Sequence, residues 1–158
     1  MDRVPMTPEG HRALEAELKR HLEELRPQIV KDIEEARAHG DISENSEYED
    51  AKHRQALCEG RIAELKGKLA RAEIIRMEDL EPSDRVVFGT TVELEDQETE
   101  ETVRYRIVGV DEADVSRGMI SFSSPIGRAL IGRSVGDEVQ VRTPGGLRSF
   151  IIVDVHYQ

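Results

Sequence analysis

Five carboxylates fall within ten residues of this chain, in a stretch without lysine or arginine: Asp41, Glu44, Glu47, Glu49 and Asp50. Ordinary carboxyl groups are ionised at neutral pH, and Mg²⁺ prefers such hard oxygen ligands. Alone, the cluster would hold Mg²⁺ weakly. Beside a site that already contains carboxylates and a phosphodiester, it could complete a two-metal arrangement. The competing interpretation is structural, because Asp41, Ser43 and Glu44 also suit the start of a helix.

Two apolar stripes flank this segment and predict the elements that position it. Downstream, the spacing alternates between three and four residues, as in the seam of a coiled coil: Tyr48, Ala51, Gln55, Cys58, Ile62, Leu65, Leu69 and Ala72. The upstream stripe is similar: Leu14, Leu18, Leu22, Leu25, Ile29, Ile33 and Ala36. Because few residues separate the stripes, we predict an antiparallel hairpin with helices of about 30 residues, roughly 45 Å long. The carboxylates would lie at its tip, residues 40–48.

Residues that begin, end or break helices agree with this hairpin. Three have suitable types at the expected ends of the first helix: Thr7, Pro8 and Gly40. Asp41 or Ser43 is predicted to cap the second helix. Pro27 lacks an N–H and lies inside the first helix, so we expect a kink or bend around residues 23–27.

After residue 77 the pattern changes from helical to strand-like. Residues 78–84 have no apolar period and are predicted to form a linker. Beyond them, short β-branched runs alternate with turn residues and predict six strands: 86–88, 90–94, 103–108, 120–122, 138–141 and 150–155. The two periodicities are segregated along the chain, which is typical of an α+β protein.

Two short signals complete the second half. Ser124 and Pro125 suit the start of a brief helix that ends near Ile131. Residues 143–146, Thr-Pro-Gly-Gly, suit a tight turn between the last two strands. We therefore predict a coiled-coil hairpin (1–77), the linker, and a small antiparallel sheet domain with one short helix (85–158).

Composition and charge restrict the function classes. No apolar run is long enough to span a membrane, and no basic-then-apolar segment opens the chain, so we expect a cytoplasmic protein. The single cysteine, Cys58, excludes internal disulfides and Cys-based zinc clusters, and its place on the seam predicts a buried apolar role. The net charge of −11 is poorly suited to wrapping duplex nucleic acid. Near the tip, Arg37, Lys52 and Arg54 could contact a nucleic-acid backbone or form ordinary ion pairs on a solvated helix face.

The segment from Ala36 to Tyr48 resembles the tip signature of bacterial Gre transcript-cleavage factors, in particular the GreA type. Further segments resemble that type in the same order along the whole chain: Met6-Thr7, Arg26-Pro27, Glu59-Gly60-Arg61-Ile62, Phe88-Gly89, Tyr105-Arg106-Ile107-Val108-Gly109, Asp111-Glu112-Ala113-Asp114, Ile120-Ser121, Ser124-Pro125-Ile126, Ala129-Leu130-Ile131-Gly132 and Thr143-Pro144-Gly145-Gly146. Departures are small. Ile42 and Ser46 stand where Leu and Ala are common, and Ser123 stands where Asp or Asn can occur.

This resemblance implies a mechanism. The coiled coil of a Gre factor enters the secondary channel of bacterial RNA polymerase, where the tip acids help hold the catalytic Mg²⁺ and a water, and backtracked RNA is cut. By position, Asp41 and Glu44 would organise the metal or the water, supported by Ser43, Asn45 and Tyr48. The chain would stimulate the polymerase rather than act as an enzyme, and would bind no Mg²⁺ stably alone. Because the two apolar stripes of the hairpin can pack on each other, a monomer is favoured, although the sequence leaves the oligomeric state open.

The resemblance also implies contacts away from the acids. Arg37, Lys52 and Arg54 would contact the 3′ end of the backtracked RNA. The second half would have the FKBP-like fold of the family. It would dock near the channel mouth through three residues: Ser123, Ser124 and Pro125. A Ser at 123 would either weaken that contact or exchange one hydrogen-bonding group for another.

Three alternatives stay open. An inhibitory Gre homologue would use the same hairpin to hold the ion unproductively, although its tips carry more clustered acids than residues 40–45 do. An FKBP-like sheet could be a prolyl isomerase, but such a pocket needs aromatic walls and the chain has 4% aromatic residues. A coiled-coil adaptor or holdase would use its acids only to cap a helix, so neutralising Asp41 and Glu44 would change stability and no polymerase activity.

Overall fold

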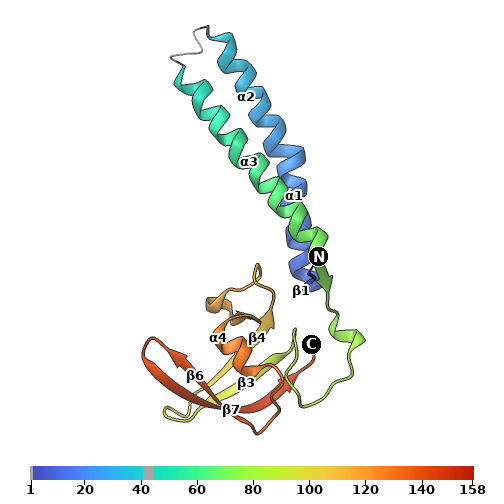
Figure 1. Cartoon of the computed structure of the whole chain (residues 1–158), viewed down its shortest axis with the longest axis vertical. Helices are drawn as coiled ribbons and strands as arrows, with labels where there is room; N and C mark the ends of the chain where they lie inside the picture. Colours follow the sequence, from blue (N-terminus) through green and yellow to red (C-terminus); the bar gives the residue numbers. More distant parts are fainter. Residues whose placement is uncertain (1, 41–44) are drawn as a thin grey trace. The chain divides into compact units, whose positions relative to one another are not determined.

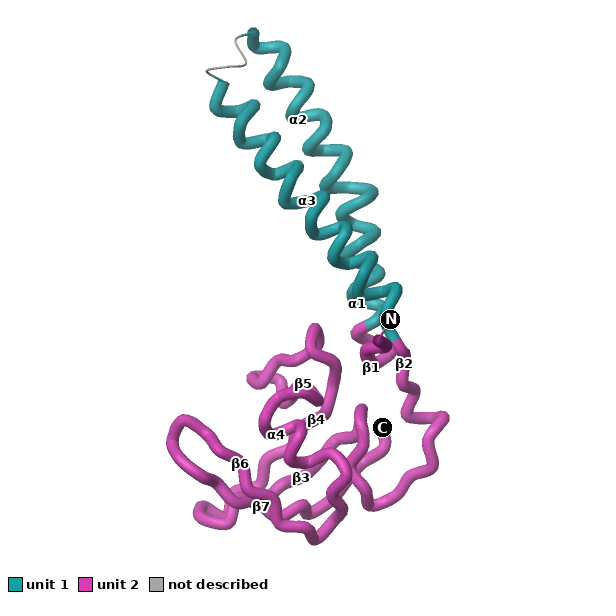
Figure 2. The backbone as a smooth tube through the Cα atoms, in the orientation of Figure 1, with its two compact units in different colours: residues 1, 11–72 teal, residues 2–10, 73–158 magenta. Residues whose placement is uncertain are grey.

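The structure, a computed structural model of the chain, describes residues 2–40 and 45–158. These residues form two compact units (Figure 2). Unit 1 contains residues 11–72, and unit 2 contains residues 2–10 together with 73–158. The first residues of the chain therefore group with the second half of the sequence.

Unit 1 is an antiparallel helical hairpin (Figure 1). Its helices are α1 (Pro8–Arg20, in unit 1 from His11), α2 (Arg26–Ala38) and α3 (Ser46–Arg71). Ion pairs between Arg61 and Glu17 and between Arg54 and Asp32 define the antiparallel direction, because the numbering falls on α3 as it rises on the partner. The predicted stripes are confirmed, since they supply one buried cluster and the side chains packed on it: Ile29, Cys58 and Ile62, with Leu18, Leu22, Leu25 and Ile33.

A π-helical segment, η1 (His21–Leu25), separates α1 from α2. The N–H of Arg26 donates to the carbonyl of His21, a bond to the fifth residue back instead of the fourth. Pro27 has no N–H for the carbonyl of Glu23, so the regular α-helical pattern cannot continue here. Helical geometry is therefore irregular at the place where a kink or bend was predicted, in the form of a π segment.

Unit 2 contains a five-stranded sheet with the order β5-β4-β3-β7-β6. Its strands are β3 (Thr91–Asp96), β4 (Thr102–Val108), β5 (Met119–Ser121), β6 (Glu138–Thr143) and β7 (Gly146–His156). All neighbours are antiparallel except β4 and β5, which are parallel. The fold class is α+β as predicted, but the sheet is mixed because the connection 109–118 carries the chain back before β5 begins.

The predicted strand at 86–88 is wrong. Only an isolated bridge between Arg85 and Ser134 forms there. Val86 is fully buried, and its backbone bonds to Gly132 and Arg133 instead of to a strand. Its apolar character reflects burial in the core and not strand pairing.

The core of unit 2 lies where the predicted strands and short helix meet. Eleven buried residues form it: Val86, Val92, Leu94, Ile107, Ile120, Leu130, Val139, Val141, Phe150, Ile152 and Val155. Helix α4 (Pro125–Leu130) covers this core, and Ser124 caps it as predicted by accepting from the N–H of Gly127 at 3.1 Å. The predicted tight turn is also confirmed, since Thr143 pairs directly with Gly146.

Residues 2–10 are fixed to unit 2 through Glu112. Its carboxylate accepts from the N–H of Thr7 at 3.1 Å, from the N–H of Gly109 at 3.0 Å and from the Thr7 hydroxyl. Thr7 caps α1 as predicted, because its hydroxyl oxygen accepts from the N–H of Gly10 at 3.0 Å. Just before it, β1 (Val4–Met6) pairs with β2 (Ala72–Ile74), a pairing that no sequence pattern predicted.

Asp96 is a buried carboxylate of unit 2 that forms an ion pair with Arg148. Hydrogen bonds from the N–H groups of Glu98 and Thr99, together with Arg148, hold its pKa below the ordinary value. A carboxyl group with a lowered folded-state pKa contributes stability that is complete above its unfolded pKa and is lost as the pH falls.

We therefore expect the urea concentration at the unfolding midpoint of the wild type to decrease once the pH falls below about 4, near the ordinary pKa of Asp. Asp96→Asn keeps an acceptor for the two N–H groups but loses the charge, so its midpoint is expected to be lower at pH 7 and flatter between pH 7 and pH 3. Urea titrations of both proteins across this range check the expectation. Parallel curves for the two proteins would assign the acid sensitivity to other groups.

Candidate functional site

The tip of the hairpin lies between the end of α2 and the start of α3. Three predicted site residues, Asp41, Ser43 and Glu44, lie outside the described residues. Gly40, the last described residue before them, has a φ of 104°, which confirms the predicted glycine-favouring position just beyond the helix. The flanking residues therefore define how the two helices present this segment.

Asn45 joins the two helices at the tip. Its side-chain oxygen accepts from the N–H of Tyr48 at 3.1 Å, and its side-chain nitrogen donates to the carbonyl of Ala36 at 2.6 Å. Asn45 is therefore the N-cap of α3, and the predicted cap at Asp41 or Ser43 is wrong. The helix begins later than its sequence pattern suggests because Asn45 has extended backbone geometry and Asn caps as well as Asp or Ser. The structure thus brings together two of the predicted supporting residues.

Asn45→Ala is expected to destabilise the start of α3. Loss of a cap costs about 1 kcal/mol, and the buried carbonyl of Ala36 also loses a partner. Hydrogen exchange should lose protection at the amide of Tyr48 more than in the middle of α3.

Asn45→Asp is the matched control, because it keeps the cap oxygen but removes the donor to Ala36. Equal protection at Tyr48 in wild type and Asn45→Ala would contradict a capping role.

The three described carboxylates near the tip have structural partners or positions. Glu47 lies 3.3 Å from the Nδ1 of His39 across the hairpin, and Asp50 lies 3.0 Å from Arg54. Glu47 and Glu49 occupy the first turn of α3, where negative charge is favourable for the helix dipole. The structural interpretation of acidic residues therefore accounts for these three.

The predicted RNA-contacting residues differ in their surroundings. Arg37 is exposed in the last turn of α2. Lys52 is also exposed, and its Nζ donates to the side chain of Gln55 at 2.9 Å. Arg54 bonds the carboxylates of Asp32 and Asp50, each at 3.0 Å, which is the ordinary ion-pair interpretation. Gln28 and Arg54 donate to Asp32 and hold its pKa below the ordinary value.

Carboxylates also gather beside the tip. A pocket there is lined by Asp32, Glu35, Ala36, His39, Glu47, Asp50 and Arg54. The described part of the tip thus combines acidic side chains with a few basic ones, and no strongly basic surface forms on these described residues.

The predicted docking residues lie just before α4 in unit 2. The hydroxyls of Ser121 and Ser123 are 2.8 Å apart, and the N–H of Ser123 donates to Ser121 at 3.1 Å. Ser124 caps α4 and also donates to the carbonyl of Ser121 at 2.7 Å. Ser123 and Pro125 are exposed, so this ordered turn presents accessible polar and apolar groups.

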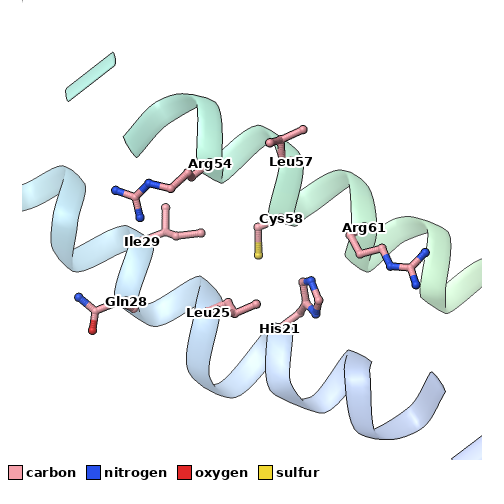
Figure 3. A pocket seen from close by; sticks show the side chains of 8 residues that line it. All are labelled: His21, Leu25, Gln28, Ile29, Arg54, Leu57, Cys58 and Arg61. Carbon is pink, nitrogen blue, oxygen red and sulfur yellow. The ribbon is translucent and has the colours of Figure 1, made fainter. Parts of the chain in front are cut away.

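A groove on the hairpin was missed by the sequence analysis. Figure 3 shows its lining residues: His21, Leu25, Gln28, Ile29, Arg54, Leu57, Cys58 and Arg61. Its volume is about 400 Å³, and it lies beside the π segment. Cys58 is buried, as the seam pattern predicts. The only sequence signal was Pro27, which predicts the irregular turn but not an opening next to it.

These observations define a class of protein: a helical hairpin with an acidic connection, joined to a small mixed-sheet unit. Residues 4–74 match a family model described as transcription elongation factor, N-terminal. Residues 81–157 match a model described as transcription elongation factor, GreA/GreB, C-term. The chain belongs to the GreA/GreB family of transcription elongation factors.

Named relatives agree over the full length. The chain is 56% identical to transcription elongation factor GreA of Beijerinckia indica subsp. indica, over 100% of both chains. It is 50% identical to transcription elongation factor GreA of Neisseria meningitidis serogroup A, over 99% of both chains. Among solved structures, GreA factor homolog 1 (Gfh1) of Thermus thermophilus is 35% identical, with 98% and 99% covered and a TM-score of 0.43.

Family membership assigns the chain to transcription elongation. It confirms the resemblance that the sequence motifs indicated. None of the helices in the two described ranges is both long enough and apolar enough to cross a membrane.

Proposed function

We propose that this chain binds bacterial RNA polymerase, inserts its helical hairpin into the secondary channel and stimulates the polymerase's own cleavage of backtracked RNA. One observation supports this most strongly. Asn45 hydrogen-bonds both the last turn of α2 and the first turn of α3, so the described residues on either side of the acidic segment are held together. Family membership over the whole chain supports the same role. This role is performed in the cytoplasm, by a monomer in our proposal.

In the proposal, Asp41 and Glu44 are the acids supplied to the polymerase site. The described neighbours Glu47 and Asp50 already form ion pairs on the helices. The donor set is chemically suitable, since Mg²⁺ is held in proteins by one or two carboxylates together with waters and phosphates. Asp41 and Glu44 would help to hold Mg²⁺ at the polymerase site, and the bound ion would supply activation of a water and stabilisation of the leaving oxygen.

Each tip residue then has a task that its own chemistry can perform. Asp41 and Glu44 orient the attacking water and add negative charge where the ion is shared with the polymerase. Ser43 supports them, and Asn45 and Tyr48 hold the start of α3 in place. The chain itself catalyses nothing without the polymerase and binds no Mg²⁺ stably alone.

In this proposal, basic residues near the tip contact the RNA. Arg37 and Lys52 are exposed and suited to the phosphates at the 3′ end of the backtracked RNA. Arg54 would have to exchange one of its bonds to Asp32 or Asp50 for a phosphate. Arg54 therefore serves first to order the helices and second to contact RNA.

Docking on the polymerase rim is assigned to the turn before α4. Ser123 and Pro125 are exposed, and Ser124 holds the turn through its bonds to Ser121 and Gly127. Ser123 supplies a hydroxyl where a carboxylate or amide can stand in relatives, so docking through it relies on a neutral hydrogen bond.

The test uses a halted, backtracked bacterial polymerase complex with Mg²⁺ and a transcript labelled at its 3′ or 5′ end. Added wild-type protein is expected to release short 3′ fragments quickly and to let the shortened RNA be extended. Binding to the polymerase without faster cleavage would support an inhibitory homologue instead. No binding at all would support the adaptor interpretation and overturn the proposal.

A further inference from the structure

Three potential metal ligands meet on the sheet of unit 2, in a region that the proposed function does not use. The register places Glu93 of β3 directly opposite Asp154 of β7, and His156 lies two residues further along β7. Side chains two residues apart on a strand share a face, and so do directly opposed residues on neighbouring strands. Their neighbours Val92, Leu94 and Val155 are buried in the core, so this trio occupies the outer face.

Two of the three distances between the donor atoms match those between ligands of one ion. The Nε2 of His156 lies 3.3 Å from the Oε1 of Glu93 and 3.5 Å from the Oδ2 of Asp154. All three donors lie within 4.8 Å of one another. Zinc binds nitrogen and oxygen ligands at about 2.0–2.2 Å in a tetrahedron, and the edges of such a tetrahedron are about 3.3–3.6 Å long.

Other contacts already orient the carboxylates. The other oxygen of Asp154, Oδ1, accepts from the N–H of Val155 at 2.9 Å, which leaves Oδ2 on the side of His156. Between Glu93 and Leu94 the register shifts by a β-bulge, a feature that often re-aims side chains at the edge of a site. Hydrogen bonds to ligating carboxylates of this kind are typical of metal sites.

We propose that Glu93, Asp154 and His156 form a site for a divalent transition metal of the zinc class. The imidazole nitrogen selects this class over Mg²⁺ and Ca²⁺, which prefer oxygen ligands alone. Three protein ligands leave a fourth position for water or another ligand. This site lies in unit 2 and is separate from the acidic tip, so it stands or falls independently of transcript cleavage.

The positive charge of Arg104 opposes the binding of a metal ion at this site. A guanidinium nitrogen of Arg104 lies 3.5 Å from the Oε1 of Glu93, on the strand that pairs with the other side of β3. A fixed positive charge so close to a ligand repels a divalent cation and competes for the same oxygen. Affinity is therefore expected to be limited by Arg104 and to rise when its charge is removed.

The test is a zinc titration of the full-length, tag-free, chelator-treated protein by isothermal calorimetry. Wild type is expected to bind one zinc ion saturably. Outer-shell changes alone weaken metal sites by about 10–100-fold, so His156→Ala and Glu93→Gln, which remove direct ligands, are each expected to weaken binding at least tenfold. Arg104→Gln is expected to tighten it about fivefold.

A matched control removes one other histidine-carboxylate pair. His11 and Glu15 are 2.9 Å apart on α1, so His11→Ala removes a comparable pair without touching the site. Its zinc affinity is expected to equal that of wild type. Added zinc should also raise the melting temperature of wild type and of His11→Ala but not of His156→Ala. Absence of saturable binding by wild type, or unchanged affinity in His156→Ala, would overturn the proposal.

Discussion

Replacing Asp41 with Asn and Glu44 with Gln in the same chain is expected to lower stimulated transcript cleavage by at least about a hundredfold. Both changes keep the size and shape of the side chains and remove the charges that the proposed mechanism assigns to Mg²⁺ and its water. The cap of α3 is Asn45, so neither change removes a helix cap. Stability should therefore stay within about 0.5 kcal/mol of wild type, as for ordinary surface substitutions. Initial cleavage rates and thermal scans of the same preparations check both halves of this expectation.

The described tip carboxylates offer a matched control for charge. Glu47→Gln with Asp50→Asn also removes two negative charges, but from residues paired with His39 and Arg54. This variant is expected to keep most of the cleavage stimulation. Equal loss in both double variants, with polymerase binding retained, would mean that total charge at the tip matters and that Asp41 and Glu44 have no special role.

Gly127→Ala is expected to destabilise unit 2 by about 3 kcal/mol or more. A Cβ at this position would lie 2.2 Å from the carbonyl oxygen of Ser121 and 3.1 Å from backbone atoms of Phe122. The carbonyl of Ser121 also accepts from the hydroxyl of Ser124, so the turn cannot move away without losing that bond. Urea unfolding followed by circular dichroism measures the change.

Gly60→Ala is the matched control for Gly127→Ala. Gly60 lies in the middle of α3 and nothing stands within 4 Å of the added Cβ. Alanine is favoured over glycine inside a helix by about 0.5–1 kcal/mol, so this variant should be slightly more stable than wild type. A Gly127→Ala protein with the wild-type midpoint would show that the turn before α4 yields easily, which would weaken its assignment as an ordered docking surface.

Sequence periodicity was sufficient to predict the hairpin. The alternating steps of three and four residues have one physical cause, the seam that α3 buries against the other helix, and Ile62 and Leu65 are buried as that pattern requires. Pro27 similarly predicted the position of an irregular turn, since a missing N–H has a local effect. The form of the irregularity depends on packing against α3 and could not be predicted.

Other features depend on pairings that no local pattern records. Asp41, Ser43 and Asn45 all have side chains that cap helices well, and the bonds of Asn45 to Tyr48 and Ala36 depend on how the two helices pack. Local sequence patterns also could not predict the parallel pairing of β4 with β5 or the isolated bridge at Arg85. Of the candidate site, the family resemblance named Asn45 and Tyr48 as supporting residues, and the structure joins them by a hydrogen bond. The ion pairs of Arg54 could not be predicted because they depend on how the two helices pack.

The side chain of Asn45 makes two hydrogen bonds at the tip, one to each helix, and these bonds affect how the sequence of the tip can vary. The bonds join the carbonyl of Ala36 and the N–H of Tyr48 to the one side chain of Asn45, and neither partner belongs to residues 41–44. Connecting segments tolerate sequence changes better than the elements that they connect. We therefore expect that substitutions at residues 41–44 leave the two hydrogen bonds of Asn45 in place, so that the chemistry of the tip can change while the helix ends stay as they are.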